Sequence, residues 1–289
     1  MEIRVLKYFM AIVTEQSILA AAESLHLSQP TLSRQIKDME EELGKQLFIR
    51  GSRKITLTEE GIILRKRAEE ILDLVQKAEN EITLSNLICG DIFIGTGETD
   101  GVRFIAKAAK MLNEQYPDIH YNIVSGDAVD IIEKLDRGLI DFAVLVGNVD
   151  ISKYNYIELP IKNTWGVLMK RNSSLAEKEF VTPQDLWEKP LIVSRQAIKG
   201  KDLTQWLKKD VSQLNIIAHY NLVYNASLMV DEGLGYALCL DKIINVTNTN
   251  LCFKAFQPKL EVGMNIVWKK YQILSKASEK FLEKLKEIL

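Results

Sequence analysis

Apolar residues at helical spacing predict two short helices at the start of the chain. The first helix follows from Val5, Leu6, Phe9, Ile12 and Val13. Ser17 is suited to cap the second, because its hydroxyl can accept a hydrogen bond from a free N–H of the first turn. The buried side of this second helix would be Ala21, Ala22 and Leu25. Small alanines let two helices cross closely, so we expect close helix packing here.

A third helix and a hairpin are predicted next. Ser28 can cap the helix, and Pro30 lies in its first turn, where a missing N–H costs nothing. The apolar stripe of this helix is Leu32, Ile36 and Met39, which leaves Gln29, Thr31, Ser33, Arg34 and Lys37 facing away. Residues 48–57 form two short apolar runs around a Gly, Ser and basic tip, which is typical of a β-hairpin.

A long helix is predicted from Thr58, which can cap it, with Glu59 and Glu60 placed favourably at its positive end. No Gly or Pro interrupts residues 62–87. The apolar stripe of this helix alternates by four and three residues, as in a heptad seam: Leu64, Ala68, Ile71, Val75, Ala78, Ile82 and Ser85. Such a seam favours a dimerising linker. The alternative is that the stripe packs on its own domain.

From Gly90 onward, strand and helix patterns alternate. Strands are predicted at 92–94, 119–124, 142–146, 165–169, 191–193, 216–220 and 236–240. Helices are predicted at about 102–116 and 129–135, with a closing helix over 273–289. This succession predicts an α/β fold with a parallel sheet, whose ligand crevice lies at the strand ends.

Composition excludes several classes of protein. The chain has 289 residues, of which 47% are hydrophobic and 26% charged, as in an ordinary globular protein. Its formal net charge of −2 argues against a protein that coats nucleic acid indiscriminately. No apolar run approaches the ~18 residues of a membrane span. Glu2 and Glu15 stand where a signal peptide would be basic and then apolar, so we expect no membrane partner and a cytoplasmic protein.

Metal, disulfide and catalytic chemistry find no support in the sequence. Three cysteines, Cys89, Cys239 and Cys252, are too scattered for a disulfide framework, and neither they nor the three histidines have zinc spacing. Neither a GxSxG elbow, an HExxH pair nor a GxxxxGK[ST] loop is present. We therefore expect no enzyme activity, no metal and no cofactor.

The most specific pattern is Ser17-(x)3-Ala21-Ala22-(x)2-Leu25-His26-Leu27-Ser28-Gln29-Pro30-Thr31-Leu32-Ser33-Arg34-Gln35-Ile36. It continues in Glu40-Glu41-Glu42-Leu43-Gly44, in Leu47-Phe48-(x)-Arg50 and in Leu57-Thr58-(x)2-Gly61. From Leu6 to about Leu72 the chain closely resembles the N-terminal signature of LysR-type transcriptional regulators. The resemblance implies a winged helix-turn-helix that reads DNA, a linker helix that dimerises, and a two-lobed, periplasmic-binding-protein-like α/β effector domain.

The resemblance also implies a domain division and partners. The winged helix-turn-helix would span 1–58, the linker helix 59–88 and the effector-binding domain 89–289. Lobe I would comprise about 90–161 and 266–289, and lobe II about 162–265, with the chain crossing near 160–162 and 263–265. The expected partners are double-stranded DNA at a promoter operator of the T-N11-A type, a small-molecule effector between the lobes, and further copies of the chain, as a homodimer that assembles into a homotetramer.

Residues expected to contact DNA lie in the third helix and at the hairpin tip. Short polar side chains at a helix N-terminus can read base edges, whereas cations fix the position on phosphates. Residues 28–67 hold nine Lys and Arg and six Asp and Glu, a local net charge of +3. The candidates are Ser28, Gln29, Pro30, Thr31, Ser33, Arg34, Lys37, Arg50, Arg53 and Lys54. The alternative is that they are solvated charges and polar helix caps.

Residues expected to contact the effector lie in loops after the strands. The candidates are Thr99, Asp100, Ser125, Gly126, Asp127, Gly147, Asn148, Ser194 and Arg195. Thr99 matches a hydroxyl position that lines the pocket in relatives. Helix capping alone also favours such residues at these turns. Glu98 and Asp100 add negative charge near the crevice, so a plain carboxylate ligand is not assured.

Two other functions are open at this point. One is a metabolite-binding module whose DNA-binding head has lost function, against which the intact Gln29, Ser33, Arg34 and Arg50 speak. The other is an enzyme built on the α/β domain, against which the missing catalytic motifs speak. Cys239 and Cys252 invite comparison with redox-sensing members of the family, but both lie in apolar runs without an adjacent cation to lower the thiol pKa.

Overall fold

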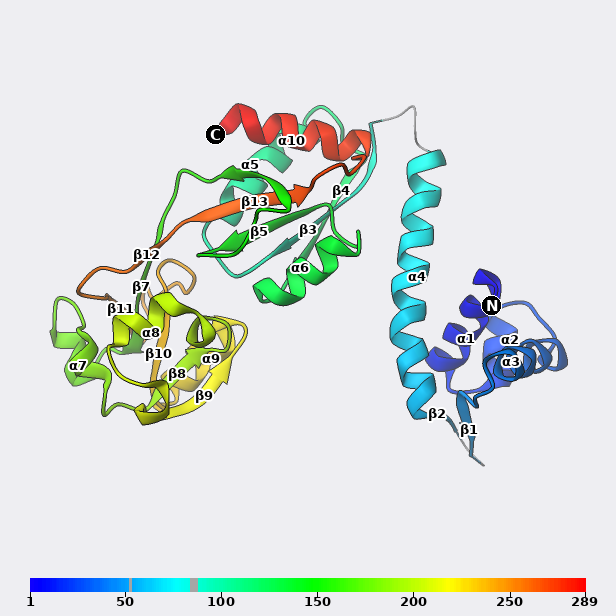
Figure 1. Ribbon diagram of the computed structural model, residues 1–289, viewed down its shortest axis with the longest axis horizontal. Helices are drawn as coiled ribbons and strands as arrows, with labels where there is room; N and C mark the ends of the chain where they lie inside the picture. The colour runs from blue at the N-terminus through cyan, green and yellow to red at the C-terminus, as the bar shows by residue number, and fades with distance from the viewer. Residues whose placement is uncertain (52–53, 84–87) are drawn as a thin grey trace. The chain divides into compact units, whose positions relative to one another are not determined.

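The computed structural model describes residues 1–51, 54–83 and 88–289 and divides the chain into two compact units, Met1–Thr83 and Leu84–Leu289 (Figure 1). The N-terminal unit contains the elements α1 (Ile3–Glu15), α2 (Ile18–Ser24), α3 (Gln29–Leu43), β1 (Phe48–Arg50), β2 (Ile55–Leu57) and α4 (Glu59–Thr83). Its core joins the three short helices to the hairpin and α4, with Phe9, Leu32 and Ala68 fully buried. The rings of Phe9 and Phe48 lie 5.1 Å apart and connect α1 to β1.

The caps predicted for the second and third helices are present. The Ser17 hydroxyl accepts a hydrogen bond from the Ala20 N–H at 3.3 Å, and the Ser28 hydroxyl accepts one from the Thr31 N–H, also at 3.3 Å. Ala21 and Ala22 are buried where α2 meets its neighbours. These local hydrogen bonds fix where α2 and α3 begin and therefore which side chains face solvent.

The start of α4 is fixed against the hairpin. The Thr58 hydroxyl accepts from the Gly61 N–H at 3.0 Å and donates to the Gln46 carbonyl at 2.8 Å. A Cβ at Gly61 would lie 2.2 Å from the Leu47 carbonyl oxygen, which no side chain tolerates. Glycine is therefore required at this position for α4 to approach the hairpin so closely.

The heptad stripe of α4 divides into two halves. Leu64, Ala68 and Ile71 pack into the core of their own unit, as the alternative interpretation of the seam required. Further along, Ala78 is exposed and Ile82 is 76% exposed. The helix ends at Thr83, and the predicted seam position Ser85 lies outside the described residues. Among the described residues, the second half of the stripe is therefore more exposed than the first.

The C-terminal unit begins with a five-stranded sheet in the order β4-β3-β5-β13-β6. Its strands are β3 (Gly90–Thr96), β4 (Ile119–Ser125), β5 (Phe142–Val146), β6 (Tyr154–Glu158) and β13 (Met264–Lys269). One face packs on α5 (Val102–Asn113) and α10 (Lys276–Ile288), and the other on α6 (Ala128–Asp136) (Figure 1). We call these elements the first lobe.

A second sheet has the order β11-β7-β10-β8-β9, with β12 paired to β7. Its strands are β7 (Asn163–Lys170), β8 (Leu191–Ser194), β9 (Ile216–Tyr220), β10 (Tyr236–Leu240), β11 (Leu251–Ala255) and β12 (Glu261–Val262). One face packs on α7 (Pro183–Leu186) and α8 (Lys201–Leu207), and the other on α9 (Val223–Asp231). Three short 3-10 helices accompany them, η1 (Ser174–Glu177), η2 (Ala197–Lys199) and η3 (Val211–Gln213). We call these elements the second lobe.

The prediction of a parallel sheet is wrong, because both sheets are mixed. In the first lobe, β3 pairs in parallel with β4 and β5, but β13 is antiparallel to β5 and β6. In the second, β10 is parallel to β8 and antiparallel to β7. The physical reason is that the chain passes between the lobes twice, so that β13 returns to the first sheet in the opposite direction. Strands β6, β11, β12 and β13 had not been predicted.

Two helix boundaries also differ from the predictions. The helix predicted over 102–116 ends at Asn113, and the closing helix begins at Lys276, where Ser275 caps it. None of the helices in the described part of the chain combines the length and apolarity of a membrane span.

Candidate functional site

The first turn of α3 is an exposed polar surface. Ser28, Gln29, Pro30 and Thr31 are exposed, and Ser33 is half-buried. The hydroxyl oxygens of Ser28 and Thr31 lie 2.7 Å apart, within hydrogen-bonding distance, in addition to the cap. Part of the polarity expected for base contact therefore also holds the helix N-terminus together.

Two cations follow on the exposed side of α3. Arg34 has an 83% exposed side chain and lies 3.9 Å from the Asp38 carboxylate, and Lys37 lies 3.3 Å from Glu41. Exposed pairs of this kind stabilise a helix by only about 0.3–0.5 kcal/mol. Both cations are therefore free to exchange these carboxylates for other anions.

The hairpin is fastened to α3 by one carboxylate. The Glu40 Oε1 atom accepts hydrogen bonds from the backbone N–H of Leu47 at 2.7 Å and of Phe48 at 3.3 Å. The Ile55 N–H donates to the Gln16 carbonyl at 3.1 Å, which ties the second hairpin strand to the turn after α1. The hairpin therefore has a fixed position relative to α3.

The hairpin tip is only partly described. Strands β1 and β2 pair antiparallel, with Phe48 opposite Leu57, and the Gly51 N–H donates to the Lys54 carbonyl at 3.1 Å. Lys54 is exposed. The Arg50 backbone lies in β1, whereas its side chain and the whole of Arg53 lie outside the described residues.

A cavity of about 550 Å³ lies between the two lobes of the C-terminal unit. Six of the nine predicted effector residues line it: Gly126, Asp127, Gly147, Asn148, Ser194 and Arg195. They come from the carboxyl ends of β4, β5 and β8, which the fold brings together at one crevice. The other three, Thr99, Asp100 and Ser125, are not among the lining residues.

Thr99 lies in the loop between β3 and α5 and packs against the segments that cross between the lobes, so the structure does not support its predicted place in the cavity. Only 9% of it is exposed. Its hydroxyl lies 2.8 Å from the Met264 sulfur and 3.4 Å from the Asn163 side-chain oxygen, and it accepts from the Gly101 N–H at 3.2 Å. The hydroxyl thus contacts three groups of the protein, and Thr99 is buried outside the lining of the cavity.

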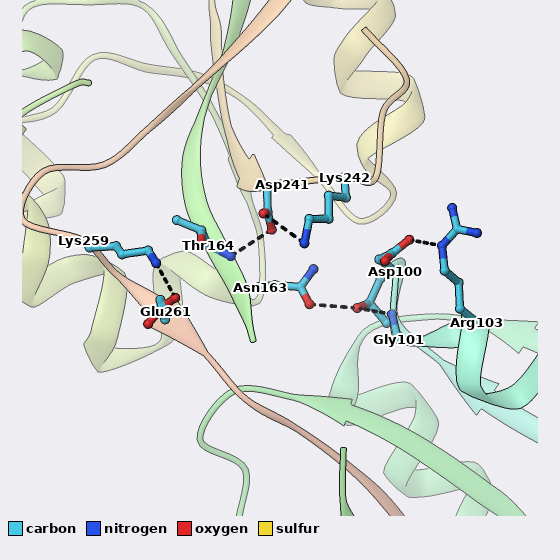
Figure 2. Close-up of polar contacts among 10 residues, drawn as sticks. Asp100, Gly101, Arg103, Asn163, Thr164, Asp241, Lys242, Lys259 and Glu261 are labelled. Carbon is cyan, nitrogen blue, oxygen red and sulfur yellow. Dashed lines mark hydrogen bonds and ion pairs between the residues drawn. The ribbon is translucent and has the colours of Figure 1, made fainter. Parts of the chain in front are cut away.

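Figure 2 shows the surroundings of this crossing, where β12 pairs with the start of β7. The Thr164 N–H donates to an Asp241 carboxylate oxygen at 2.8 Å, which fixes the beginning of β7 to the end of β10. Asp100 forms an ion pair with Arg103 at 2.5 Å. Asp100 is therefore occupied by its own helix, and Ser125 is exposed at the end of β4.

Several lining residues were not among the predicted candidates. They include Glu98, Trp165, Gln196, Tyr220, Leu240 and Val262. The Tyr220 hydroxyl donates to the Leu238 carbonyl at 2.7 Å, and burial raises the pKa of Tyr220 well above its usual value. The sequence could have indicated Glu98 and Gln196 as lining residues, because each lies in a loop directly beside a predicted effector residue. No local signal distinguishes Trp165 or Leu240 from ordinary core residues.

The acidic groups of the cavity have partners within the chain. Asp127 accepts from the N–H groups of Val129 and Asp130, both at 3.0 Å, and caps α6. Asp202 accepts from the Asn148 amide at 3.0 and 3.2 Å. Glu98 accepts from the Val223 N–H. Each lining carboxylate therefore has at least one donor from the protein itself.

The cations that line the cavity, unlike its carboxylates, have no hydrogen-bond partners among the described residues. Arg195, Lys199 and Lys201 are exposed, come from one segment of the second lobe, and form no side-chain hydrogen bond or ion pair with the described residues. Their charge is available to an anion. Apolar walls are supplied by Trp165, Leu240 and Val262.

Two of the three thiols, Cys239 and Cys252, lack the lowered pKa that a reactive thiol needs. Burial raises the pKa of Cys239 to about 12 and also raises that of Cys252, so both remain protonated and unreactive near neutral pH. Among the described residues, no group of three or more His, Cys, Asp or Glu side chains could hold a metal ion.

Known proteins match this chain in both units. The family model "Bacterial regulatory helix-turn-helix protein, lysR family" matches residues 3–62, and "LysR substrate binding domain" matches residues 85–289. The HTH-type transcriptional regulator BsdA of Bacillus subtilis (strain 168) is 39% identical over 146 residues, which is half of this chain and half of that protein.

Two further matches span nearly the whole chain. The probable RuBisCO transcriptional regulator of Phaeodactylum tricornutum (strain CCAP 1055/1) is 28% identical over 298 residues, covering 99% of this chain and 96% of its own length. The crystal structure of full-length CbnR complexed with its target DNA has a TM-score of 0.74 at 17% identity and covers 100% of each chain. At that identity the likeness shows a shared fold.

Proposed function

The chain belongs to the LysR family of bacterial transcriptional regulators, and from this premise we propose that its N-terminal unit binds a promoter operator and its C-terminal unit binds a small acidic effector. The family consists of regulators with a helix-turn-helix and a substrate-binding domain, and not of enzymes. DNA binding implies that this chain acts in the cytoplasm. The observation that carries the proposal is the exposed polar first turn of α3, together with a hairpin that the Glu40 carboxylate holds in place against α3.

On DNA, α3 would enter the major groove and the hairpin would follow the backbone. Gln29, Thr31 and Ser33 are the side chains for base edges, with Ser28 and Pro30 setting the approach of the helix. The cations would contact the phosphates: Arg34, Lys37, Arg50, Arg53 and Lys54. The expected operator is of the T-N11-A type, with one half-site for each head.

Dimerisation would use the exposed second half of the α4 stripe, where Ala78 and Ile82 are exposed and Val75 is half-buried. Leu74 is not a position of the predicted seam, but it is also exposed and lies four residues before Ala78. Exposed aliphatic side chains at this spacing favour a second helix. We expect a homodimer that assembles into a homotetramer.

The effector is expected to be an acidic molecule with an apolar part. The cavity's carboxylates accept hydrogen bonds from the protein, whereas Arg195, Lys199 and Lys201 have no side-chain partner among the residues that the structure describes, so the charged groups open to a ligand are cations. Trp165, Leu240 and Val262 suit the apolar part. A volume of about 550 Å³ is ordinary for a small-molecule site.

DNA binding is tested with Ser33→Ala and Lys54→Ala in the full chain. Loss of a base contact should cost about 1–3 kcal/mol on a T-N11-A fragment and reduce discrimination against a scrambled fragment. Loss of a phosphate contact should weaken binding to both fragments alike and reduce the salt slope by about 1. Lys153→Ala, an exposed cation of the C-terminal unit, is the control. Fluorescence anisotropy at several salt concentrations measures both effects. Altered base preference in Lys54→Ala with unchanged binding by Ser33→Ala would reverse the assigned roles.

Effector binding is tested by thermal shift of the full chain with a panel of small organic acids and their carboxamides. An acid at about a hundred times its Kd should stabilise the protein by about 2.7 kcal/mol, and its carboxamide should not. Arg195→Ala should lose this response, whereas Lys153→Ala should retain it. Preferential stabilisation by the carboxamides would contradict the acidic class.

A further inference from the structure

Three polar contacts join the two lobes beside the cavity. The Glu98 carboxylate of the first lobe accepts from the Val223 N–H at the start of α9. The Gln196 side-chain oxygen of the second lobe accepts from the Ala128 N–H at 2.9 Å, at the start of α6. In the third contact the Asn148 amide donates to both oxygens of Asp202. Each contact pairs one residue from each lobe.

Two of these contacts are reciprocal helix caps. The N-cap residue of α9, Leu222, has no capping side chain, and Glu98 supplies the missing acceptor from the opposite lobe. In α6 the local cap Asp127 takes the next two N–H groups but not that of Ala128, which Gln196 takes. The first N–H groups of a helix need such acceptors. Each lobe therefore completes the N-terminus of a helix in the other.

Five of the residues that form these interlobe contacts also line the cavity. Glu98, Asn148, Gln196, Asp202 and Val223 all line the cavity. A molecule that fills the cavity must therefore lie against the groups that hold the lobes together. A carboxylate on that molecule would also seek the same kind of N–H donor that Glu98 now occupies.

We propose that Glu98–Val223, Gln196–Ala128 and Asn148–Asp202 form an interlobe latch, and that the effector acts on the regulator by displacing it. The link to the effector rests on the proposed function of the cavity, whereas the latch itself does not. Glu98 is the central member, because a carboxylate hydrogen-bonded to a helix N-terminus is also attracted by the helix dipole. Because the latch couples two helices, breaking one contact loosens the others.

Hydrogen exchange of the full chain, followed by mass spectrometry without added ligand, tests the latch. The variants are Glu98→Ala, which loses the acceptor, Glu98→Gln, which keeps an amide oxygen, and Gln196→Ala. The control is Glu188→Gln, whose side chain is 89% exposed beside Lys209. Glu98→Ala should speed exchange about tenfold at the start of α9 and also at the start of α6, where Ala128 lies. Glu98→Gln should speed exchange less than Glu98→Ala at both places, because it keeps an acceptor oxygen and loses only the charge.

The coupling between helices decides the outcome. Gln196→Ala should speed exchange at the start of α9, although it contacts only α6, and Glu188→Gln should change neither place. Faster exchange confined to the helix that lost its own acceptor would mean two independent caps and would overturn the latch. Unchanged exchange in Glu98→Ala would overturn it too. If the latch is supported but none of the acids stabilises the protein, the effector proposal fails and the latch stands.

Discussion

Removal of the Glu40 carboxylate is the sharpest test of how the hairpin is held. Glu40 is half-buried near the end of α3, and its Oε1 atom accepts from the N–H groups of Leu47 and Phe48. Glu40→Ala leaves both donors without this acceptor where the chain is partly shielded from water. Each hydrogen bond to a charged group contributes about 1.5–3 kcal/mol. Because the second bond is long, at 3.3 Å, we expect a total loss of about 2–3 kcal/mol.

The neighbouring Glu41 provides a matched control. It lies on the same helix, its side chain is 65% exposed, and it forms an ion pair with Lys37 at 3.3 Å. Glu41→Ala should therefore change the free energy of unfolding by no more than about 0.5 kcal/mol. Urea unfolding of the full chain, monitored for the N-terminal unit by hydrogen exchange of the hairpin, measures both variants.

The reasoning also predicts a functional effect. A hairpin released from α3 should lose its contribution to DNA binding, so Glu40→Ala should bind the T-N11-A fragment less tightly although Glu40 itself faces no base. Destabilisation by Glu40→Ala no greater than that by Glu41→Ala would refute the assigned role of this carboxylate. So would faster hairpin exchange in Glu41→Ala than in Glu40→Ala.

Three further changes have defined outcomes. Leu74→Asp with Ile82→Asp should yield a monomer in sedimentation, because a helix pair would bury these charges unpaired; a persistent dimer would place the interface elsewhere. Burial and the hydrogen bond to Asp136 raise the pKa of Tyr154 to about 12. The fold thus favours protonated Tyr154, so its stabilising effect is complete below pH 10 and is lost as pH rises toward 12; urea titrations should show this decline, and Tyr154→Phe should flatten it. Cys239, with a pKa of about 12, should react with iodoacetamide at pH 8 only in urea; rapid labelling of the native chain would contradict its burial.

Local interactions explain what the sequence predicted well. The caps at Ser17, Ser28 and Thr58 act within a few residues, so their effect can be read from short patterns. Strand ends followed by Gly, Asp or Asn likewise predicted four residues of the cavity wall, Gly126, Asp127, Gly147 and Asn148, since the carboxyl ends of neighbouring strands meet at one edge of a sheet.

Contacts between distant parts of the chain explain what it did not predict. Thr99 lies in a suitable loop, but its hydroxyl is taken by Met264, 165 residues away. The Glu98 contact with Val223 spans 125 residues, and that of Gln196 with Ala128 spans 68. Strand β13 joins the first sheet antiparallel for the same reason, because its partners are fixed by the second crossing and not by its own residues.

The double crossing between the lobes has a consequence for the order in which a nascent chain folds. The second lobe is continuous from Asn163 to Val262, so all its strands leave the ribosome one after another. The first lobe begins earlier, at Gly90, but lacks its fourth-position strand β13 and the covering helix α10 until Ile288 has been made. The lobe that starts first therefore finishes last, and its half-built sheet exposes the edge of β5 while the second lobe folds, which leaves this edge open to misassembly in the nascent chain.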